Sequence, residues 1–172
     1  MIKIRIPLLA CIFLCSTFIF SQSNITGDLQ KWHTTTVTFN GPNTSENSAT
    51  NPFLDYRLDV TFTSPSGQTF VVPGFYAADG NAAETSANSG NKWRVRFTSN
   101  EIGNWSYVAS FRTGSNIAVN ESLTAGNTTS FHGSSGNFKI SASNKIIPDN
   151  RAKGRLNYVG ERYLKFEETE DY

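Results

Sequence analysis

Two acidic residues in one polar segment, Asp79 and Glu84, are the first candidates for chemistry in this sequence. A pair of carboxyl groups can cleave a glycosidic bond, and the separation of the two groups in space decides how they act. The other acids that could join them, Asp55 and Asp59, show no local apolar enclosure that would raise a carboxyl pKa. The sequence therefore favours a solvated loop over a catalytic pair.

The signals for metal binding are incomplete. Asp79-Gly80-Asn81 is similar to part of a calcium loop, but the spaced series that ends in a bidentate glutamate is absent, so a turn is the better interpretation. His33 and His132 are the only histidines, and two distant histidines without a cysteine make a weak zinc site. His33 is expected to lie in a strand and to form a local hydrogen bond. Because no G-x-S-x-G motif occurs either, we expect no catalytic set, no metal and no cofactor.

Three aromatic residues, Trp32, Tyr56 and Tyr76, are candidates for sugar binding. A flat ring can lie against the C–H face of a pyranose while nearby Asn or Asp groups bind its hydroxyls. Packing in the protein core is the alternative for each of the three rings. The sequence favours packing.

One basic cluster, formed by Arg151, Lys153 and Arg155, is too short for the large positive field that phosphate binding uses. The 172-residue chain has 15 Lys and Arg against 14 Asp and Glu. Nothing therefore favours nucleic acid as a partner. The three cations could pair with anionic polysaccharide groups, but contact with a neighbouring domain is the interpretation that we favour.

The segment 92–111 carries two tryptophans, Trp93 and Trp105, on either side of a polar turn at 98–103. Successive residues of a strand point to opposite sides, so the alternation places each ring on the apolar face of its strand. Burying rings of this size stabilises by roughly 2–3 kcal/mol each, whereas an exposed aromatic stripe invites aggregation. We therefore predict a hairpin with both tryptophans in a core, and a sugar-stacking platform is the alternative.

Short extended runs, separated by turns rich in Gly, Pro and Asn, make up the rest of the sequence. No segment after residue 22 shows a convincing apolar repeat of 3.6 residues. The pattern predicts an all-β fold, an immunoglobulin-like antiparallel β-sandwich, although the Cys-Trp-Cys signature of antibody domains is absent. The predicted strands are 29–40, 53–63, 69–77, 93–98, 105–111, 137–142, 155–159 and 162–166, with a bulge or edge at Pro73-Gly74 and a two-residue turn at Gly160-Glu161.

Residues 1–22 have the pattern of a signal peptide, since two cations precede an apolar run at 6–20. The run is shorter than the ~20 residues that a membrane-spanning helix needs. A retained anchor is therefore the second choice, and lipidation at Cys11 is a minor one. Both cysteines lie in this leader, so the mature chain has none. We expect a secreted, periplasmic or cell-surface protein without a stable membrane span, with its sandwich over 23–150.

Several segments together resemble a known family. They are GFY at 74–76, WRVRFT at 93–98, GNWSY at 103–107 and RAKG at 151–154. They resemble the domain of unknown function 5060, the N-terminal module of proteins assigned as secreted glycoside hydrolases, and the resemblance covers nearly all of the mature chain. It implies an immunoglobulin-like, non-catalytic ancillary module that supports or positions a TIM-barrel glycoside hydrolase domain, and it supplies no catalytic residues. An independent carbohydrate-binding module is the alternative.

The segment 151–172 is expected to be a C-terminal hairpin that resembles the start of the catalytic domain. The sequence ends at EETEDY, whereas a (β/α)₈ barrel needs about 250 residues. A truncated, frameshifted or split gene and a sequence fragment are alternatives that stay open. A third possibility is that the chain is a remnant, unstable without its barrel. Its last hairpin, 155–166, would then expose Leu156, Tyr158, Leu164 and Phe166 where a partner should sit.

Overall fold

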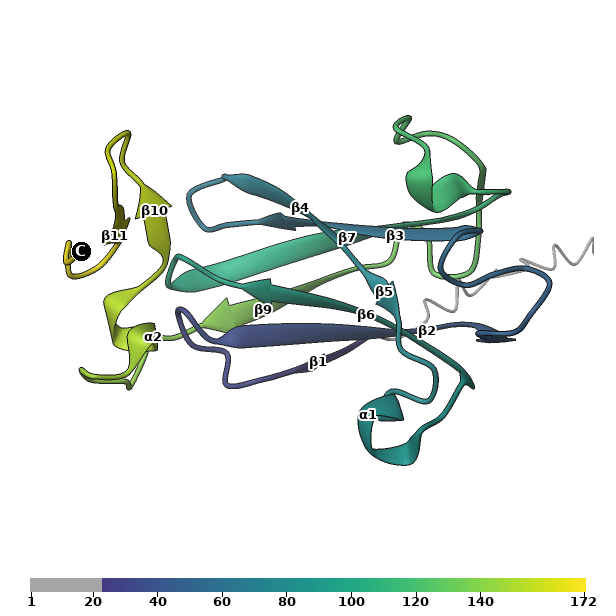
Figure 1. Ribbon diagram of the computed structural model, residues 1–172, viewed down its shortest axis with the longest axis horizontal. Coiled ribbons are helices and arrows are strands. Elements are labelled where there is room, and N and C mark those ends of the chain that lie inside the picture. The colour runs from purple at the N-terminus through teal and green to yellow at the C-terminus, as the bar shows by residue number, and fades with distance from the viewer. Residues whose placement is uncertain (1–22) are drawn as a thin grey trace, which may run out of the picture.

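A computed structural model describes residues 23–172, so the predicted signal peptide and its two cysteines lie outside the described residues. The described chain forms two antiparallel sheets that pack face to face, with a separate hairpin at one end (Figure 1). Over residues 23–172, no helix has both the length and the apolar character needed to cross a membrane.

The two sheets have the strand order of an immunoglobulin-type sandwich. In that type, strands A, B, E and D form one sheet and strands C, F and G form the other. The order β1-β2-β6-β5 corresponds to the first sheet and β3-β7-β9 to the second, with β4 added beside β3 and β8 beside β7. The predicted all-β sandwich is therefore confirmed. The strands are β1 (Asn24–Thr26), β2 (Thr34–Ser45), β3 (Tyr56–Thr63), β4 (Thr69–Pro73), β5 (Phe75–Tyr76), β6 (Ser89–Thr98), β7 (Gly103–Thr113), β8 (Asn127–Thr128) and β9 (Ser135–Ile140).

Aromatic rings from the two sheets meet in the core. Trp93 of β6 contacts Phe111 of β7 with ring centroids 4.7 Å apart, and Trp105 of β7 contacts Phe97 of β6 at 5.0 Å. Both tryptophans are at most 2% exposed, which confirms the predicted core. The predicted hairpin is wrong, because β6 and β7 belong to different sheets. The turn at 98–103 therefore crosses from one layer to the other and places the two tryptophans on facing sheets.

The predicted strand 69–77 is also divided between the two sheets. β4 pairs with β3 as far as Pro73, and β5 begins at Phe75 beside β6. The chain crosses between the sheets at Gly74. The position has no room for a side chain, because a Cβ atom there would lie 2.4 Å from Leu58 Cδ2 and 2.8 Å from the carbonyl oxygen of Arg94. The predicted edge is confirmed, because β4 and β5 are both edge strands. The interruption at this point is a change of sheet and not a bulge.

The predicted strand 29–40 begins later and ends later in the structure. Leu29 and Trp32 have φ angles of 50° and 65°, in the left-handed region, so the backbone turns before β2 begins at Thr34. Beyond Asn40, β2 continues past an irregularity in its pairing with β6, to Ser45. The turn before β2 brings Trp32 to one end of the sandwich.

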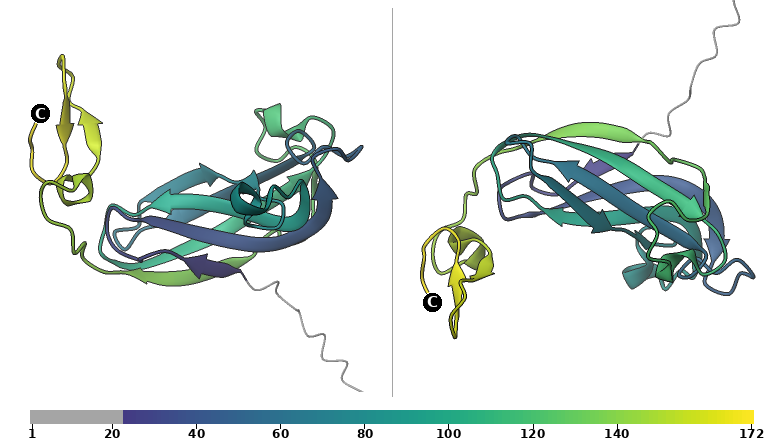
Figure 2. Two further views of the ribbon diagram at one scale, coloured as in Figure 1. Left: turned by 60° about the horizontal axis from the view of Figure 1, so that its bottom comes forward. Right: turned by 90° about the horizontal axis from the view of Figure 1, so that it is seen from above.

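A short helix, α2 (Asn150–Lys153), leads from the sandwich into the hairpin of β10 (Leu156–Tyr158) and β11 (Leu164–Phe166). The predicted hairpin is confirmed. Its register pairs Tyr158 with Leu164, so the loop has five residues and not two. The loop is longer than predicted because Tyr158 and Leu164 form the last pair of the ladder. Val159 and Tyr163, which are both exposed, stay unpaired. Figure 2 shows the hairpin standing at the end of the sandwich, crosswise to the sheets.

Two arginines, Arg57 of β3 and Arg112 of β7, hold the loop between β7 and β8, which contains the 3₁₀ helix η1 (Ile117–Val119). The two residues lie directly opposite each other in the sheet. Arg57 donates hydrogen bonds to the carbonyl oxygens of residues 120 and 122 at 2.8 and 2.9 Å. Arg112 donates to those of residues 124, 125 and 126 at 2.6–2.7 Å. The carbonyl dipoles thus offset the repulsion between the two guanidinium groups.

Replacing Arg112 with lysine is expected to loosen this loop at constant charge. An ammonium group lacks the planar fork of donors with which a guanidinium holds several carbonyls at once. The freed carbonyls can bind water, so we expect the free energy of unfolding to fall by only about 1 kcal/mol. Urea unfolding measures that change, and amide hydrogen exchange over 115–126 should become faster. The exposed Arg162 supplies the matched control, Arg162→Lys, and unchanged exchange in Arg112→Lys would contradict the proposed role of Arg112.

Candidate functional site

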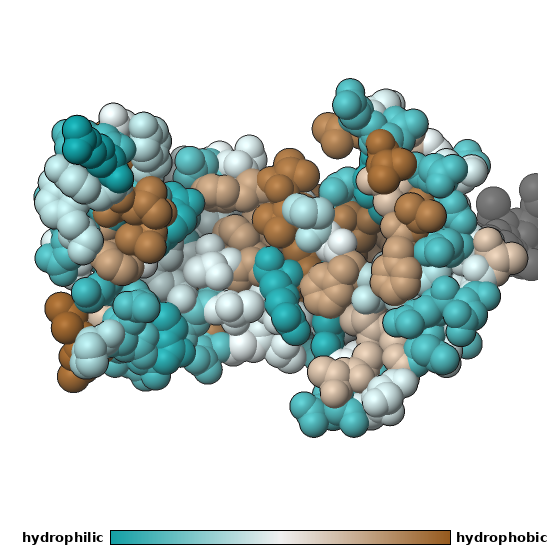
Figure 3. All heavy atoms as spheres, viewed as in Figure 1, coloured by the Kyte–Doolittle hydropathy of each residue, from teal (hydrophilic) through white to brown (hydrophobic). Residues whose placement is uncertain are grey.

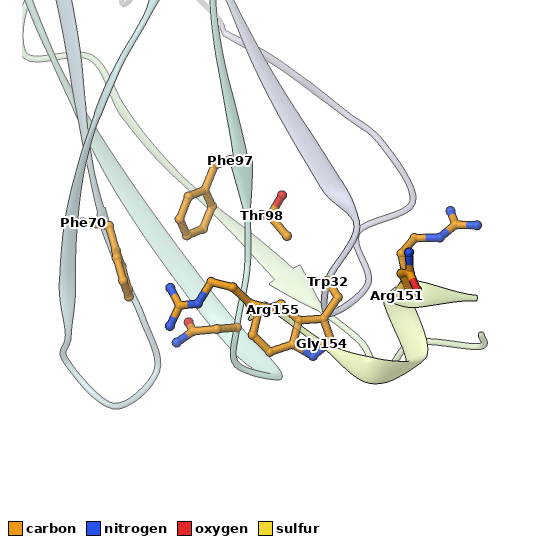
Figure 4. A pocket seen from close by; sticks show the side chains of 9 residues that line it. Trp32, Phe70, Phe97, Thr98, Arg151, Gly154 and Arg155 are labelled. Atoms are coloured by element: carbon orange, nitrogen blue, oxygen red, sulfur yellow. The ribbon is translucent and has the colours of Figure 1, made fainter. Parts of the chain in front are cut away.

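A cavity of about 470 Å³ lies at the end of the sandwich, where α2 and the residues after it cover the sheets (Figure 4). The sandwich supplies an aromatic wall, and the C-terminal segment supplies a polar one. The cavity therefore joins residues that lie far apart in the sequence. Its lining consists of Trp32, Phe70, Phe97, Thr98 and Asn100 from the sandwich, and of Asn150, Arg151, Gly154 and Arg155 from the C-terminal segment.

Trp32 of the sandwich contacts the C-terminal segment. Its Nε1 donates a hydrogen bond to Glu168 Oε1 at 3.0 Å, and Lys31 Nζ donates to the same oxygen. Gly154 passes close to the indole, since a Cβ atom there would lie 3.3 Å from Trp32 Cε2. The side chain is 9% exposed. The structure thus packs Trp32 beneath the C-terminal segment, which is the alternative that the sequence favoured for this candidate sugar contact.

The three cations of the predicted basic cluster point to different partners. Arg151 is paired with Asp149 at 2.6 Å, which holds the pKa of that carboxyl well below its usual range. The Lys153 ammonium lies 5.0 Å from the centre of the Phe166 ring. Figure 4 shows Arg155 extending into the cavity, whereas the guanidinium of Arg151 points away from it. Residues two apart on a helix are rotated by about 200°, so Arg151 and Lys153 cannot share one face of α2.

The Glu168 carboxylate is expected to control the docking of the C-terminal segment through its ionisation. The hydrogen bond from Lys31 makes the largest contribution to lowering its pKa, and the hydrogen bond from the Trp32 indole lowers the pKa further. Because the folded pKa is below the unfolded one, the ionised carboxylate stabilises the docked state at neutral pH. That contribution is lost as the pH falls through the folded pKa. We therefore expect the NMR signal of the Trp32 indole N–H to titrate with a midpoint below that of a free glutamate.

Glu168→Gln is the matched variant for this titration. Its amide oxygen can still accept the hydrogen bond from Trp32, but the charge that pairs with Lys31 is gone. The indole signal should therefore lose its acid titration while the segment stays docked at neutral pH. A wild-type midpoint at or above that of a free glutamate would refute the assignment.

The other two candidate sugar contacts, Tyr56 and Tyr76, meet at a second hollow of about 230 Å³ beside β5. Both rings pack on Trp93 with centroids 5.1 Å away. The Tyr76 hydroxyl donates to the carbonyl oxygens of residues 44 and 90 at 2.6 and 3.2 Å, and burial raises the pKa of this phenol. The two tyrosines therefore belong mainly to the core and form the floor of the hollow.

Two further aromatic rings, Phe53 and Phe75, lie at the rim of this hollow. The sequence did not predict them as candidate sugar contacts. They are 52% and 40% exposed. Phe53 stands edge-on to Tyr76 with centroids 6.0 Å apart. The available signal was that Phe75 and Tyr76 are adjacent in an extended segment, so that burial of one turns the other outward.

Asp59 lines the same hollow, and its environment corrects an expectation from the sequence. Its side chain is 19% exposed, and burial raises the pKa of the carboxyl, although Arg57 Nε at 3.3 Å acts in the opposite direction. The sequence predicted no apolar enclosure for this acid. That prediction is wrong. The groups that line the hollow with Asp59, such as Pro52 and Pro73, come from other parts of the chain, so the neighbouring sequence did not reveal the enclosure.

Asp79 has the opposite environment. It accepts hydrogen bonds from Asn81 N and Thr85 Oγ1, each at 2.7 Å, and these two contacts lower its pKa. The carboxylate thereby holds the turn that leads into the short helix α1 (Ala82–Thr85), which confirms the predicted turn. A carboxyl group with a lowered pKa is a poor proton donor at neutral pH.

The two histidines have structural partners. His33 is 3% exposed and its ring nitrogens contact Asp28 at 2.8 Å and Ser143 at 3.2 Å. The predicted local hydrogen bond is confirmed, but His33 lies in the turn before β2 and not in a strand. His132 Nδ1 accepts the backbone N–H of Phe111 at 3.1 Å. In the chain from residue 23 onward, no three potential metal-ligating side chains gather at one point.

Comparison with known proteins adds a family and one related structure. The model of the family described as domain of unknown function (DUF5060) matches residues 28–112. The fold is similar to the crystal structure of "a putative glycoside hydrolase from Bacteroides vulgatus ATCC 8482", with a TM-score of 0.53 and 25% sequence identity. The similarity covers 83% of this chain and 20% of that one, so the chain spans about a fifth of the length of this relative. No curated protein shows a significant sequence match.

Proposed function

Residues 28–112 belong to the DUF5060 family, and from that premise we propose that this protein is a non-catalytic ancillary module of a secreted glycoside hydrolase. Its role is to support or position a catalytic domain. One observation carries the proposal, which is the exposed apolar face of the hairpin at the end of the sandwich. The similarity to a fifth of a larger relative supports the same role.

The apolar face of the hairpin is formed by Leu156, Tyr158 and Leu164. Leu156 and Leu164 are each 47% exposed and Tyr158 is 73% exposed. The register places Tyr158 directly opposite Leu164, so their side chains lie on the same face. Exposure of these three residues was predicted and is confirmed, whereas Phe166 is half-buried beneath Lys153. Exposed apolar residues gathered on one face are a feature of surfaces that bind partners.

The hairpin is tied to the segment that docks on the sandwich. Backbone N–H groups of residues 167 and 168 donate to the carbonyl oxygens of residues 155 and 153 at 2.9 and 3.0 Å. The side chain of Glu168 then reaches Trp32. A domain that binds the hairpin would therefore be oriented relative to the whole sandwich.

A chimaera tests the ancillary role. Residues 23–172 would replace the aligned fifth of the Bacteroides vulgatus relative, and calorimetry would follow its unfolding. We expect one cooperative transition, because the module stabilises the rest of the chain through the hairpin face. The double variant Tyr158→Ser, Leu164→Ser should separate the transition into two. Val71→Ser, at a 58% exposed position on β4, is the control. Identical melting of the chimaera and the double variant would refute the proposal.

A hydrolysis assay tests the non-catalytic part. The purified mature protein is expected to release no reducing sugar from a panel of algal and plant polysaccharides. Release that disappears in an Asp79→Ala, Glu84→Ala variant would show that the module is itself an enzyme.

An independent carbohydrate-binding module is the second candidate. The observation that favours it is the pair of exposed rings, Phe53 and Phe75, at the rim of a hollow that contains Asp59. Affinity electrophoresis in polysaccharide gels separates the two candidates. Retarded migration in any gel supports binding, and a folded protein that no gel retards excludes it.

A further inference from the structure

Two hollows meet at Phe75, along the edge where the chain changes sheets. The first, of about 230 Å³, contains Asp59 and the Phe53 ring. The second, of about 260 Å³, is lined by Asn81, Arg94 and Arg96, among others. Phe75 and Tyr76 line both, so the exposed Phe75 ring forms a ridge between them. Figure 3 views this face, where apolar surface lies beside strongly hydrophilic side chains.

The second hollow contains two arginines that form no close ion pair, although the charge of Arg94 is near enough to the Asp79 carboxylate to help lower its pKa. Neither Arg94 nor Arg96 has a carboxylate oxygen within 4.0 Å among residues 23–172. Arg94 is held in place, because its Nε donates to Thr38 Oγ1 at 3.0 Å and the loop passes close to its Nη2 at Gly80. Arg96 lies over the Phe75 ring, 5.5 Å from its centre. Two positioned cations beside an open hollow suit an anionic ligand.

The first hollow offers an acceptor for hydroxyl groups. Asp59 has one ion-pair contact in the described chain, to Arg57 Nε at 3.3 Å, and a carboxylate has about four lone-pair sites. The rings of Phe75 and Phe53 line the same hollow as this carboxylate. Arg96 lines only the second hollow, so it leaves the side of Phe75 that faces Asp59 open. An aromatic ring beside a carboxylate is a suitable site for a sugar ring with its hydroxyls.

We propose that this groove, formed by Asp59, Phe75, Asn81, Arg94 and Arg96, binds an acidic oligosaccharide. One sugar ring packs on Phe75 with its hydroxyls toward Asp59, and the carboxylate or sulfate of the next unit lies between Arg94 and Arg96. The proposal rests on the carbohydrate-binding candidate and deepens it, because it names the site and the chemical class of the ligand. Uronate and sulfate share the chemistry that the two guanidinium groups recognise.

Isothermal titration calorimetry of the mature protein at low ionic strength tests the ligand class. The probes are oligogalacturonate for carboxylate, a sulfated galactan oligosaccharide for sulfate, and neutral galactan and cellulose oligosaccharides. We expect at least one acidic probe to bind tenfold or more tightly than the neutral ones. Higher salt should weaken that binding, because charge pairs are screened.

Single substitutions test the site. Phe75→Ala is expected to weaken binding of the acidic probe at least tenfold, and Arg94→Gln or Arg96→Gln should remove most of the preference for acidic over neutral probes. Val71→Ala and Arg162→Gln, at exposed positions of β4 and the hairpin loop, are the matched controls and should leave binding unchanged. NMR shift mapping on the wild-type protein gives a second readout, which requires no variant to fold and should locate the perturbed amides at β5 and β6.

The outcomes separate the two levels of the proposal. If no probe binds to the folded protein, both the groove and the carbohydrate-binding candidate are excluded, while the ancillary role is untouched. If neutral probes bind as tightly as acidic ones, the assigned ligand class is wrong although the module binds sugar. If Arg162→Gln weakens binding as much as Arg94→Gln, the attraction is a general charge effect and the site is wrong.

Discussion

Trp105→Ala is expected to lower the free energy of unfolding by about 3–5 kcal/mol, the range for removing a large aromatic side chain from a core. Trp105 is fully buried, and its ring lies 5.0 Å from Phe97 and 6.0 Å from Phe70. Its Nε1 also donates to the carbonyl oxygen of Glu101 at 3.0 Å. The substitution therefore removes contacts between the sheets and a buried hydrogen bond together. Urea denaturation of the mature domain measures the loss.

Phenylalanine variants at the two buried tryptophans separate the packing from the hydrogen bond. In the described chain, Trp93 Nε1 is buried and has no hydrogen-bond partner, whereas Trp105 Nε1 has one. Trp105→Phe should therefore destabilise by about 1 kcal/mol more than Trp93→Phe. Equal losses in the two variants would contradict the role of the Glu101 contact. A stable Trp105→Ala variant, within 1 kcal/mol of the wild type, would contradict the core itself.

Gly74→Ala is expected to destabilise by about 1–3 kcal/mol, as overpacking of a tightly fitted site does. The added methyl group would lie 2.4 Å from Leu58 Cδ2 and 2.8 Å from the backbone oxygen of Arg94. The leucine side chain can move, but the oxygen belongs to β6 and can move only with its strand. The loss should therefore appear as a lower midpoint in urea and as faster amide exchange in β5.

Gly114→Ala is the matched control for this substitution. At Gly114 a Cβ atom would have its nearest neighbour at 3.4 Å, an ordinary van der Waals contact. The same chemical change should therefore alter the free energy of unfolding little. If both variants unfold at the same urea concentration, the close approach at Gly74 is not what determines stability there.

The sequence predicted which side chains are buried better than it predicted how the strands pair. The period of two in β6 and β7 is a local property, and it correctly placed Trp93 and Trp105 inside. Whether two consecutive strands join one sheet or two depends on contacts with strands that are distant in the sequence. The turn at 98–103 and the Pro73-Gly74 step were therefore located correctly, but their function as crossings between sheets was not predicted.

The candidate sites show a similar division. Trp32, Tyr56 and Tyr76 were selected by residue type, and the structure places all three at cavities but largely within packed surroundings. The exposed ring of Phe53 was missed because it lies in the turn before β3, where burial does not alternate, and Phe75 was missed although its position next to Tyr76 indicated an outward ring. The enclosure of Asp59 was missed because the fold, and not the neighbouring sequence, supplies it.

The change of sheet at Gly74 also affects self-association. It divides what would be one long edge strand into two, of five and two residues. The first ends in Pro73, which has no N–H group to donate. A neighbouring molecule therefore meets only short rows of unpaired backbone groups, a poor template for intermolecular strand addition. At high concentration the same step should help keep these sheet edges from pairing edge to edge into fibrils.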